Sequence, residues 1–386
     1  MSNKKKYIFI VQVTRQLSID ILNTFASQGA EIELVTGVVE SNYAPLNPSI
    51  KVKFYNKYDN TSGFKRMFTW SLFTFLSFFH VLFSSKKKEL ILITTPPFIV
   101  FTGLFFKRLR NQNYHLIIWD LYPDVLVNFG VLKESSWIIK YWKKINKTCF
   151  TKASNVFTLG KHLANAINNY TQETPKTIPN WVNADFVKPM EKAENTFAKE
   201  HNLQDKLVVM YSGNMGLTHD LESIVYAAEA LQNNSSIHFV LIGDGAKKAK
   251  ITQYVSEKNL TNLLILPYQS NEVLPYSLSC PDIGIVTLSQ GAETISVPSK
   301  TYYTLAAGSA ILALASHESE LGLLIEEYNC GKVFENPKTE EIVKFIEGLV
   351  QEKNQLKEYK ENARKASFNF TPENAKQYYN YIYGKN

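Results

Sequence analysis

Short apolar runs alternate with longer amphipathic stretches along most of this chain of 386 residues. Apolar runs of this length, bounded by polar and turn-forming residues, are typical of buried strands, and the stretches between them have the length of helices. In the first half the predicted strands are residues 7–13, 32–36, 90–94, 116–120 and 155–159, and a short helix follows to about residue 170. This alternation predicts parallel sheets built from strand–helix–strand units.

The same pattern restarts after a polar, proline-containing stretch at residues 171–206. Strands are predicted at residues 207–212, 238–242, 263–266, 283–288, 310–314 and 331–334, and helices at 221–231 and 246–258. A last helix is predicted at residues 372–383, with Thr371 as its N-cap and Pro372 as its first residue. We therefore expect an α/β protein with two doubly wound domains, residues 1–180 and 181–370, and a C-terminal helix at 371–386 that crosses back to the first domain.

Charge is distributed unevenly between the two halves. Residues 1–180 contain 23 Lys and Arg against 10 Asp and Glu, and the remainder contains 19 against 25. With 45% hydrophobic and 20% charged residues the chain is globular, so the basic half indicates an anionic partner of a folded domain. Nucleic acid and an anionic membrane surface are the two candidates.

Residues 64–88 favour the membrane. Residues 67–83 are mostly apolar or aromatic, Lys65 and Arg66 precede them, and Lys86, Lys87 and Lys88 follow. The run is marginal for a bilayer span, and a helix lying in the interface fits better. A helix buried in the core, with solvated lysines at its end, is an equally good explanation. Nucleic acid is disfavoured because the basic residues flank an apolar block and do not alternate with stacking positions.

Three predicted strand–helix junctions in the second half carry residues suited to an anion. Gly213 and Gly216 let the backbone approach a ligand after the first strand, and Gly243-Asp244-Gly245 follows the second. Residues 297–308 follow another strand: Pro298 suits a first helical turn, Ser299 and Lys300 add a hydroxyl and an ammonium group, and Gly308 suits a helix end. The loops match neither a Walker motif nor a dinucleotide fingerprint. Each could be an ordinary turn, but together they indicate a nucleotide-diphosphate site.

These motifs resemble the donor-binding domain of retaining glycosyltransferases of family 4, which have the two-domain GT-B fold. The resemblance rests on Tyr-Ser-Gly-Asn-Met-Gly (211–216), Leu-Ile-Gly-Asp-Gly (241–245), Leu-Pro-Tyr (266–268), Pro-Asp-Ile-Gly-Ile-Val (281–286) and Pro-Ser-Lys (298–300). Trp-Asp-Leu-Tyr-Pro-Asp (119–124) and Ile-Pro-Asn-Trp-Val-Asn (178–183) also match the bacterial branch that builds O-antigen, capsule and colanic acid.

The resemblance implies a role for each matching residue. Backbone N–H groups of Gly213, Asn214 and Gly216 would contact the donor diphosphate, Ser299 and Lys300 would hold its distal phosphate, and Leu266 and Tyr268 would flank the base. The implied catalytic residues are Asp120, Lys300 and Glu293, and the implied donor-binding residues are Gly213, Asn214, Gly216, His219, Gly243, Asp244, Leu266, Tyr268, Pro298, Ser299 and Tyr303. His219 stands where many relatives carry a lysine, so it is either a pH-dependent charge or a locally hydrogen-bonded residue.

The chain also departs from the family pattern. Ile295 and Tyr303 stand where many members carry two glutamates, and Asn214 stands where an arginine is expected. The N-terminal glycine-rich acceptor loop is replaced by residues 14–18, Thr-Arg-Gln-Leu-Ser. Most of the positive charge at the phosphates must therefore come from Lys300, and Glu293 is the nearest candidate for the missing acid.

The sequence therefore predicts a retaining glycosyltransferase at the cytoplasmic face of a bacterial plasma membrane. It would transfer a sugar, plausibly N-acetylated, from a UDP-sugar to a polyprenyl-diphosphate-linked saccharide. No cofactor and no metal are expected, since no Asp-x-Asp occurs in the chain. A UDP-sugar 2-epimerase of the same fold and a catalytically degenerate sugar-nucleotide-binding scaffold are the alternatives.

Overall fold

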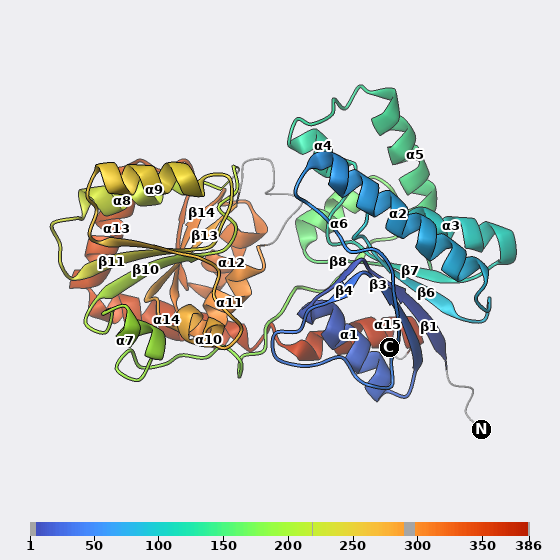
Figure 1. The fold of residues 1–386 in the computed structure, drawn as a ribbon, viewed down its shortest axis with the longest axis horizontal. Coiled ribbons are helices and arrows are strands. Elements are labelled where there is room, and N and C mark those ends of the chain that lie inside the picture. The colour runs from blue at the N-terminus through green and yellow to red at the C-terminus, as the bar shows by residue number, and fades with distance from the viewer. Residues whose placement is uncertain (1–4, 218, 289–297, 385–386) are drawn as a thin grey trace. The chain divides into compact units, whose positions relative to one another are not determined.

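The computed structural model describes residues 5–217, 219–288 and 298–384. The chain forms two compact units, and each is described by itself (Figure 1). Within the described residues the first unit comprises the chain up to Asn180 and from Pro372 onwards, and the second comprises Trp181 to Thr371. The sequence analysis drew its boundaries at 180/181 and 370/371.

The first unit contains a seven-stranded parallel sheet in the order β5-β3-β1-β6-β7-β8-β9. Its strands are β1 (Lys6–Ile10), β3 (Glu31–Thr36), β5 (Lys51–Phe54), β6 (Glu89–Ile93), β7 (Tyr114–Ile117), β8 (Asn155–Thr158) and β9 (Lys176–Thr177), and β2 (Val13–Thr14) pairs separately with β4 (Val38–Val39). Its helices are α1 (Gln16–Ser27), α2 (Gly63–Leu82), α3 (Ile99–Arg110), α4 (Asp124–Asn128), α5 (Trp137–Lys152), α6 (Lys161–Asn168) and α15 (Ala375–Tyr383).

The second unit contains a six-stranded parallel sheet in the order β12-β11-β10-β13-β14-β15. Its strands are β10 (Leu207–Ser212), β11 (Ile237–Ile242), β12 (Leu263–Leu266), β13 (Ile283–Thr287), β14 (Ala310–Leu314) and β15 (Gly331–Phe334). Its helices are α7 (Thr196–Glu200), α8 (Glu222–Ala230), α9 (Lys248–Glu257), α10 (Leu274–Ser279), α11 (Lys300–Ala307), α12 (Glu320–Tyr328), α13 (Thr339–Gln351) and α14 (Lys353–Ser367). The prediction of two Rossmann-like α/β domains is confirmed.

Alternation along β10 shows why its run is apolar throughout. Val209 and Tyr211 are buried in the core under α8, α9 and α13, whereas Val208 and Met210 are buried in the core under α7 and α10. A parallel strand covered by helices on both faces needs apolar side chains at consecutive positions. The layers are visible in Figure 1, where α8 and α9 lie on one side of this sheet and α7 and α10 on the other.

Three predicted elements of the first unit differ from the structure. The run at residues 7–13 is two strands, because β1 ends at Ile10 and β2 pairs with β4. The strand predicted at residues 116–120 lies two to three residues too far towards the C-terminus, since pairing with β6 confines β7 to Tyr114–Ile117. Thr371 is not an N-cap of the last helix, because Pro372–Asn374 form a 3-10 turn and α15 begins at Ala375 with Asn374 as its N-cap.

Helix α15 packs inside the first unit. The ring of Tyr379 lies 5.1 Å from that of Phe25 on α1, and the ring of Tyr378 lies 5.0 Å from that of Phe157 on β8. The C-terminal segment therefore completes the core of the N-terminal unit.

Helix α2 has a buried side and an exposed aromatic side. Trp70, Phe73 and Val81 are buried, whereas Phe75 is 59% exposed and Phe79 is 39% exposed. Packing in the core therefore accounts for only part of this aromatic segment. Among the described residues, no helix combines the length and the hydropathy that crossing a bilayer requires.

Candidate functional site

The candidate site lies where the strand order of the second sheet reverses. Strands β10 and β13 are neighbours, and the chain winds outward from them in opposite directions. The carboxyl ends of such a pair leave room for a ligand, because their following loops diverge to opposite sides. The loop after β10 begins with Gly213, and α11 follows β13, so the topology brings the Gly-Asn-Met-Gly loop and Lys300 together.

The loop after β10 packs backbone against backbone on the turn after β11. Gly213 N–H donates to Ile242 O at 2.9 Å, and Met215 N–H donates to Asp244 O at 2.7 Å. A Cβ on Gly243, where φ is +144°, would lie 1.9 Å from Gly213 O. These two turns therefore form one rigid unit that only glycine at residue 243 permits.

This pairing corrects the predicted role of Gly213. Its backbone N–H is already used inside the protein, so it is not available to a diphosphate. Its function is steric: a Cβ at Gly213 would lie 2.9 Å from Lys300 Nζ, so the missing side chain leaves room for the amine. Asn214 is exposed at the tip of the loop, and its carbonyl accepts a 2.5 Å hydrogen bond from the Tyr211 hydroxyl.

Lys300 begins α11, and its amine points at the first loop. Its Nζ is buried, lies 3.8 Å from the centre of the Tyr211 ring and has no hydrogen-bond partner among the described residues. The aromatic face attracts the cation but offers it no hydrogen-bond acceptor. Burial lowers the pKa of Lys300 to about 7. A buried amine that no described residue pairs with is stabilised by an anion, and an anionic ligand at the edge of the loop would supply that charge.

The start and end of α11 largely follow the predicted pattern. Ser299 is the N-cap and is exposed, and its side chain makes no capping hydrogen bond. Pro298 precedes it, and its carbonyl accepts the Thr301 N–H at 3.0 Å, so the first turn begins at the proline. Gly308 ends the helix with φ of +66°, and Tyr303 is half-buried on the helix.

His219 does not supply the positive charge that one interpretation gave it. Burial, with Lys300 and Lys247 nearby, lowers its pKa to about 4, so the imidazole is neutral at neutral pH. Its Nδ1 is buried and has no hydrogen-bond partner among the described residues. The backbone of His219 is hydrogen-bonded locally, since its N–H donates to Gly216 O and its carbonyl accepts the Leu221 N–H, both at 3.1 Å, so the local hydrogen-bond interpretation holds for the backbone. The imidazole of His219 therefore lines the site as an uncharged group.

Two residues that sequence reasoning missed organise this site. Tyr211 lies under the amine of Lys300 and also ties the loop through its hydroxyl. Lys247 donates to the carbonyl of His219 at 2.7 Å and to Glu222 Oε2 at 2.6 Å, which fastens the end of the same loop. Tyr211 was part of the quoted motif, but a tyrosine inside an apolar strand signals only core packing.

The other predicted donor residues lie at the neighbouring strand ends. Leu266 ends β12, is half-buried and accepts the Gly243 N–H at 2.9 Å, and Tyr268 is 57% exposed two residues later. Asp244 is exposed, and its Oδ1 accepts the Gly245 N–H at 2.7 Å, as in a tight turn. Gly216 lies within the first loop, where a Cβ would approach Asn214 Nδ2 to 2.9 Å.

The predicted catalytic residues fall in different places. Asp120 belongs to the first unit, is exposed and lies three residues beyond the end of β7, next to Trp119, whose N–H donates to Thr94 Oγ1 at 3.1 Å. Lys300 belongs to the second unit. Glu293 and Ile295 lie outside the described residues. In the part of the chain that is described, no group of three or more His, Cys, Asp or Glu side chains is arranged to hold a metal ion.

Comparisons with known proteins agree with this architecture. Residues 192–366 match the family model of the group 1 glycosyl transferases. The chain is 26% identical over 241 residues to the probable glycosyltransferase WbjE of Pseudomonas aeruginosa, a match covering 62% of this chain and 60% of that protein. It is 26% identical over 275 residues to the putative colanic acid biosynthesis glycosyl transferase WcaI of Escherichia coli (strain K12), covering 69% and 67%. The chain thus spans about 60% of the length of the first of these relatives.

Among solved structures, the fold matches Anabaena Alr3699/HepE in complex with UDP and glucose. The TM-score is 0.73 at 11% identity, and the match covers 99% of this chain and 100% of that one. The two α/β units together have the GT-B fold. Over residues 192–366 the second unit is similar to the group 1 glycosyl transferases, in agreement with the resemblance seen in the sequence.

Proposed function

We propose that this protein is a retaining glycosyltransferase that moves a sugar from a UDP-sugar to a lipid-linked saccharide during assembly of a bacterial surface polysaccharide. The observation that carries the proposal is the amine of Lys300, which is buried beside the loop after β10 and has no hydrogen-bond partner in the described part of the chain. The similarity to the probable glycosyltransferase WbjE supports the reaction, and the similarity to the putative colanic acid biosynthesis glycosyl transferase WcaI supports the pathway class. The HepE complex supports a UDP donor.

Lys300 would bind the distal phosphate of the donor. As the bond between the sugar and the diphosphate breaks, negative charge grows on the leaving UDP, and a fixed cation stabilises that charge most where water is excluded. Ser299 is exposed at the start of α11 and would add its hydroxyl and the helix N-terminus. The amides of Asn214 and Gly216 would complete the cradle, in place of the occupied amide of Gly213.

The remaining donor contacts follow from position. Leu266 and Tyr268, at the end of β12, would flank the base, and an exposed tyrosine ring offers a face on which a base can stack. Gly243 and Asp244 would shape the floor between base and diphosphate. The family resemblance assigns Asp120 of the first unit and Glu293 to the reacting sugar.

The proposed transfer needs no metal ion. Lys300 and the loop amides would take the part that a divalent cation plays at other diphosphate sites. Transfer should therefore continue in excess EDTA, and activity that returns only when Mg²⁺ or Mn²⁺ is added would overturn this part of the proposal.

The direct test supplies UDP-sugars and a polyprenyl-diphosphate-linked acceptor and measures the glycosylated product. Lys300→Ala and Asp120→Asn should each lower kcat/KM about 100-fold or more, since each removes a group to which the proposal gives a role in catalysis. Lys250→Ala, which changes an exposed lysine on α9, is the matched control and should keep full activity. Normal turnover of both site variants, or release of an epimerised sugar without acceptor, would overturn the proposal.

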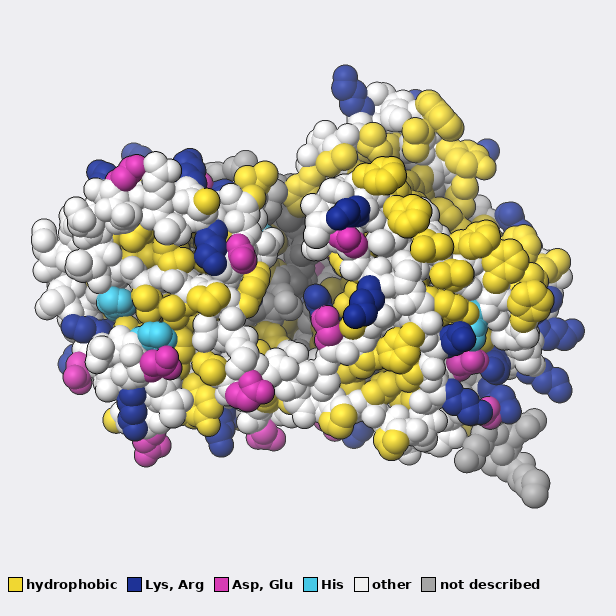
Figure 2. Space-filling model, viewed as in Figure 1, with side chains coloured by type: hydrophobic (Ala, Val, Ile, Leu, Met, Phe, Trp, Pro, Cys, Tyr) yellow, Lys and Arg dark blue, Asp and Glu magenta, His cyan; other side chains and the backbone are white. Residues whose placement is uncertain are grey.

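We also propose that the first unit binds the inner face of the membrane from the cytoplasm. Phe75 and Phe79 on α2 have ring centres 4.8 Å apart, and Phe78 links them to Phe105 of α3, at 5.7 Å from Phe79 and 4.9 Å from Phe105. Phe105 and Leu109 of α3 are 45% and 58% exposed, so the aromatic surface continues across both helices. Figure 2 shows hydrophobic side chains gathered over this unit.

Helix α5 adds a second exposed apolar group that the sequence analysis did not single out. Trp137 is 75% exposed and Tyr141 is 61% exposed, and the exposed Lys140 and Lys144 lie between and beside them. Aromatic side chains at headgroup depth beside lysines suit an anionic interface.

Sedimentation with phosphatidylglycerol vesicles tests this surface. Phe75→Ser with Phe79→Ser should reduce the vesicle-bound fraction several-fold, because the change removes two large apolar side chains from the interface. Phe368→Ser, an equally exposed phenylalanine of the second unit, should leave binding unchanged. Equal recovery of both variants with vesicles would refute the membrane surface.

A further inference from the structure

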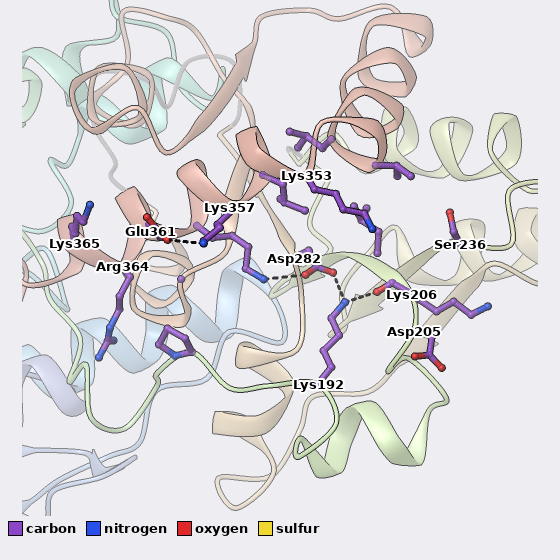
Figure 3. Close-up of a pocket in the computed structure, with 17 residues that line it drawn as sticks. Lys192, Asp205, Lys206, Ser236, Asp282, Lys353, Lys357, Glu361, Arg364 and Lys365 are labelled. Carbon is purple, nitrogen blue, oxygen red and sulfur yellow. Dashed lines mark hydrogen bonds and ion pairs between the residues drawn. The ribbon is translucent and has the colours of Figure 1, made fainter.

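A cavity of about 800 Å³ opens at the amino-terminal edge of the second sheet (Figure 3). It is lined by Leu207 at the start of β10, by Asp282 just before β13, by Gly308 just before β14 and by one side of α14. The candidate donor site lies at the opposite, carboxyl ends of these strands. The cavity therefore shares no lining residue with that site.

Positive charge is concentrated in this cavity. Six lysines and Arg364 line it, against three carboxylates, those of Asp205, Asp282 and Glu361. From residue 181 onwards the chain as a whole has 19 basic and 25 acidic residues. An otherwise acidic half thus places seven of its basic side chains around one hollow, which favours an anionic occupant.

The sequence of α14 produces this arrangement. Lys353, Lys357, Lys360 and Arg364 are spaced by four, three and four residues, so they fall on one face of the helix. All four line the cavity. The helical periodicity of α14 therefore places four basic side chains in a row along the wall of the cavity.

Part of this charge is already neutralised. Lys192 and Lys360 both pair with Asp282, Lys360 at 3.0 Å, and Arg364 donates to the carbonyls of Ala184 and Ala306 at 3.1 and 2.8 Å. These groups build the floor and hold α14 on the sheet.

Two lysines of the row remain available to a ligand. Lys353 makes no ion pair within the described residues, and Lys357 approaches only Glu361, at 3.9 Å on the exposed helix surface. An exposed pair at that distance contributes little and is readily exchanged for a stronger anion.

Much of the remaining lining is apolar. Leu349 is buried, and Val350, Leu356 and Leu207 are half-buried beside it. An apolar wall below two available ammonium groups suits a molecule with a hydrocarbon part and an anionic head. The volume lies within the range of pockets that bind small organic ligands, about 300–1,000 Å³.

We propose that this cavity binds an amphipathic organic phosphate, with the phosphate on Lys353 and Lys357 and the hydrocarbon against Leu349 and Leu356. A phosphate is favoured because two lysines one helical turn apart can share its oxygens as charge-assisted hydrogen-bond acceptors. The cavity lies at the opposite strand ends from the candidate donor site, so its ligand is not the acceptor in the reacting position. The inference does not depend on the proposed function.

Calorimetric titration of the full chain with dodecyl phosphate, below its micelle concentration, tests the proposal. One molecule should bind per chain, and Lys353→Ala with Lys357→Ala should weaken binding about tenfold or more. Lys338→Ala with Lys344→Ala removes the same charge from exposed positions outside the cavity and should leave the affinity unchanged. UDP affinity should be the same in all of these proteins, which separates this site from the donor site.

Further measurements distinguish this site from other modes of binding and identify whether the natural ligand is a lipid or a soluble molecule. Dodecyl maltoside should bind at least tenfold more weakly, and Phe75→Ser with Phe79→Ser should not alter dodecyl phosphate binding. If the variant with both Lys353 and Lys357 replaced loses vesicle binding, the natural ligand is a membrane lipid. If its vesicle binding is unchanged, the natural ligand is a soluble phosphate. Equal affinity of the detergent and the phosphate, or of this variant and the unaltered protein, would overturn the proposal.

Discussion

Proton uptake on UDP binding is the sharpest consequence of the site around Lys300. In the unliganded protein burial lowers the pKa of this amine to about 7. A bound diphosphate would supply the missing counter-charge and raise the pKa again, because a nearby anion favours the charged form. Above pH 7 the neutral amine must therefore gain a proton as UDP binds.

The magnitude follows from the two protonation states. With a pKa of about 7 in the unliganded protein, half the molecules carry the charge at pH 7 and about one in a hundred carries it at pH 9. If the bound form stays protonated, UDP affinity should fall about 50-fold over this interval, or about 2.3 kcal/mol. The phosphate groups of UDP are essentially ionised throughout this range, since their last pKa is near 6.

Isothermal titration calorimetry at pH 7, 8 and 9, in two buffers of different ionisation enthalpy, measures both quantities. Proton uptake should rise from about half a proton per UDP at pH 7 to about 0.9 at pH 8 and nearly one at pH 9. Lys300→Met should bind UDP weakly and without this pH dependence, whereas Lys250→Met should behave like the unaltered protein. Constant affinity between pH 7 and 9 with no proton uptake would refute the assigned role of Lys300.

Three further perturbations test the same site through stability. Gly243→Ala should lower the free energy of unfolding by about 2–4 kcal/mol and abolish UDP binding, because its Cβ would lie 1.9 Å from Gly213 O. The control is Gly348→Ala in α13, where the space around the glycine is open. In urea denaturation this control variant should be as stable as the unaltered protein or slightly more stable. The pKa of His219 is about 4 in the folded protein, so its contribution to the free energy of unfolding is present above pH 6.5 and is lost as the pH falls towards 4. Between pH 7 and 4.5 the free energy of unfolding of His219→Gln should therefore fall by about 2 kcal/mol less than that of the unaltered protein. Identical acid unfolding curves of the two proteins would contradict this. Lys300→Met should stabilise the unliganded protein at pH 6 by about 1–3 kcal/mol, measured by thermal unfolding, because it removes a buried charge without a hydrogen-bond partner among the described residues; an unchanged or lower Tm would contradict it.

The second unit could be predicted from the sequence more accurately than the first. Residues 207–212, 263–266, 310–314 and 331–334 are strands with the expected bounds. The apolar runs of these strands are short and end at turn residues such as Gly213 and Pro267, so the residue types alone indicate where each strand begins and ends. In the first unit β7 begins at Tyr114-His115, and only its pairing with Leu90 and Ile91 of β6 fixes where it lies.

The candidate site shows a similar limit. The sequence identified Lys300 as the main cation of the cradle, but not that it would lie on the Tyr211 ring. Nor did it show that the Gly213 amide is used by Ile242, because that hydrogen bond joins loops about 30 residues apart, a separation that no local pattern reveals. The row of cations on α14 was visible as a spacing, but a charged helix face is usually only solvated, and the cavity beneath it arises from tertiary packing.

The environment of Lys300 explains why an anion would be recognised strongly at this position. An exposed lysine is already solvated, so a phosphate gains little from it beyond a screened ion pair. The amine of Lys300 has lost that solvation and, among the described residues, has only the face of Tyr211 in exchange. The unliganded protein thus holds a destabilised group that a diphosphate would relieve, and part of the binding energy comes from ending that unfavourable state. The same argument predicts that replacing Tyr211 by a carboxylate-bearing residue, which would pair with the amine permanently, should weaken UDP binding even though it adds an interaction with Lys300.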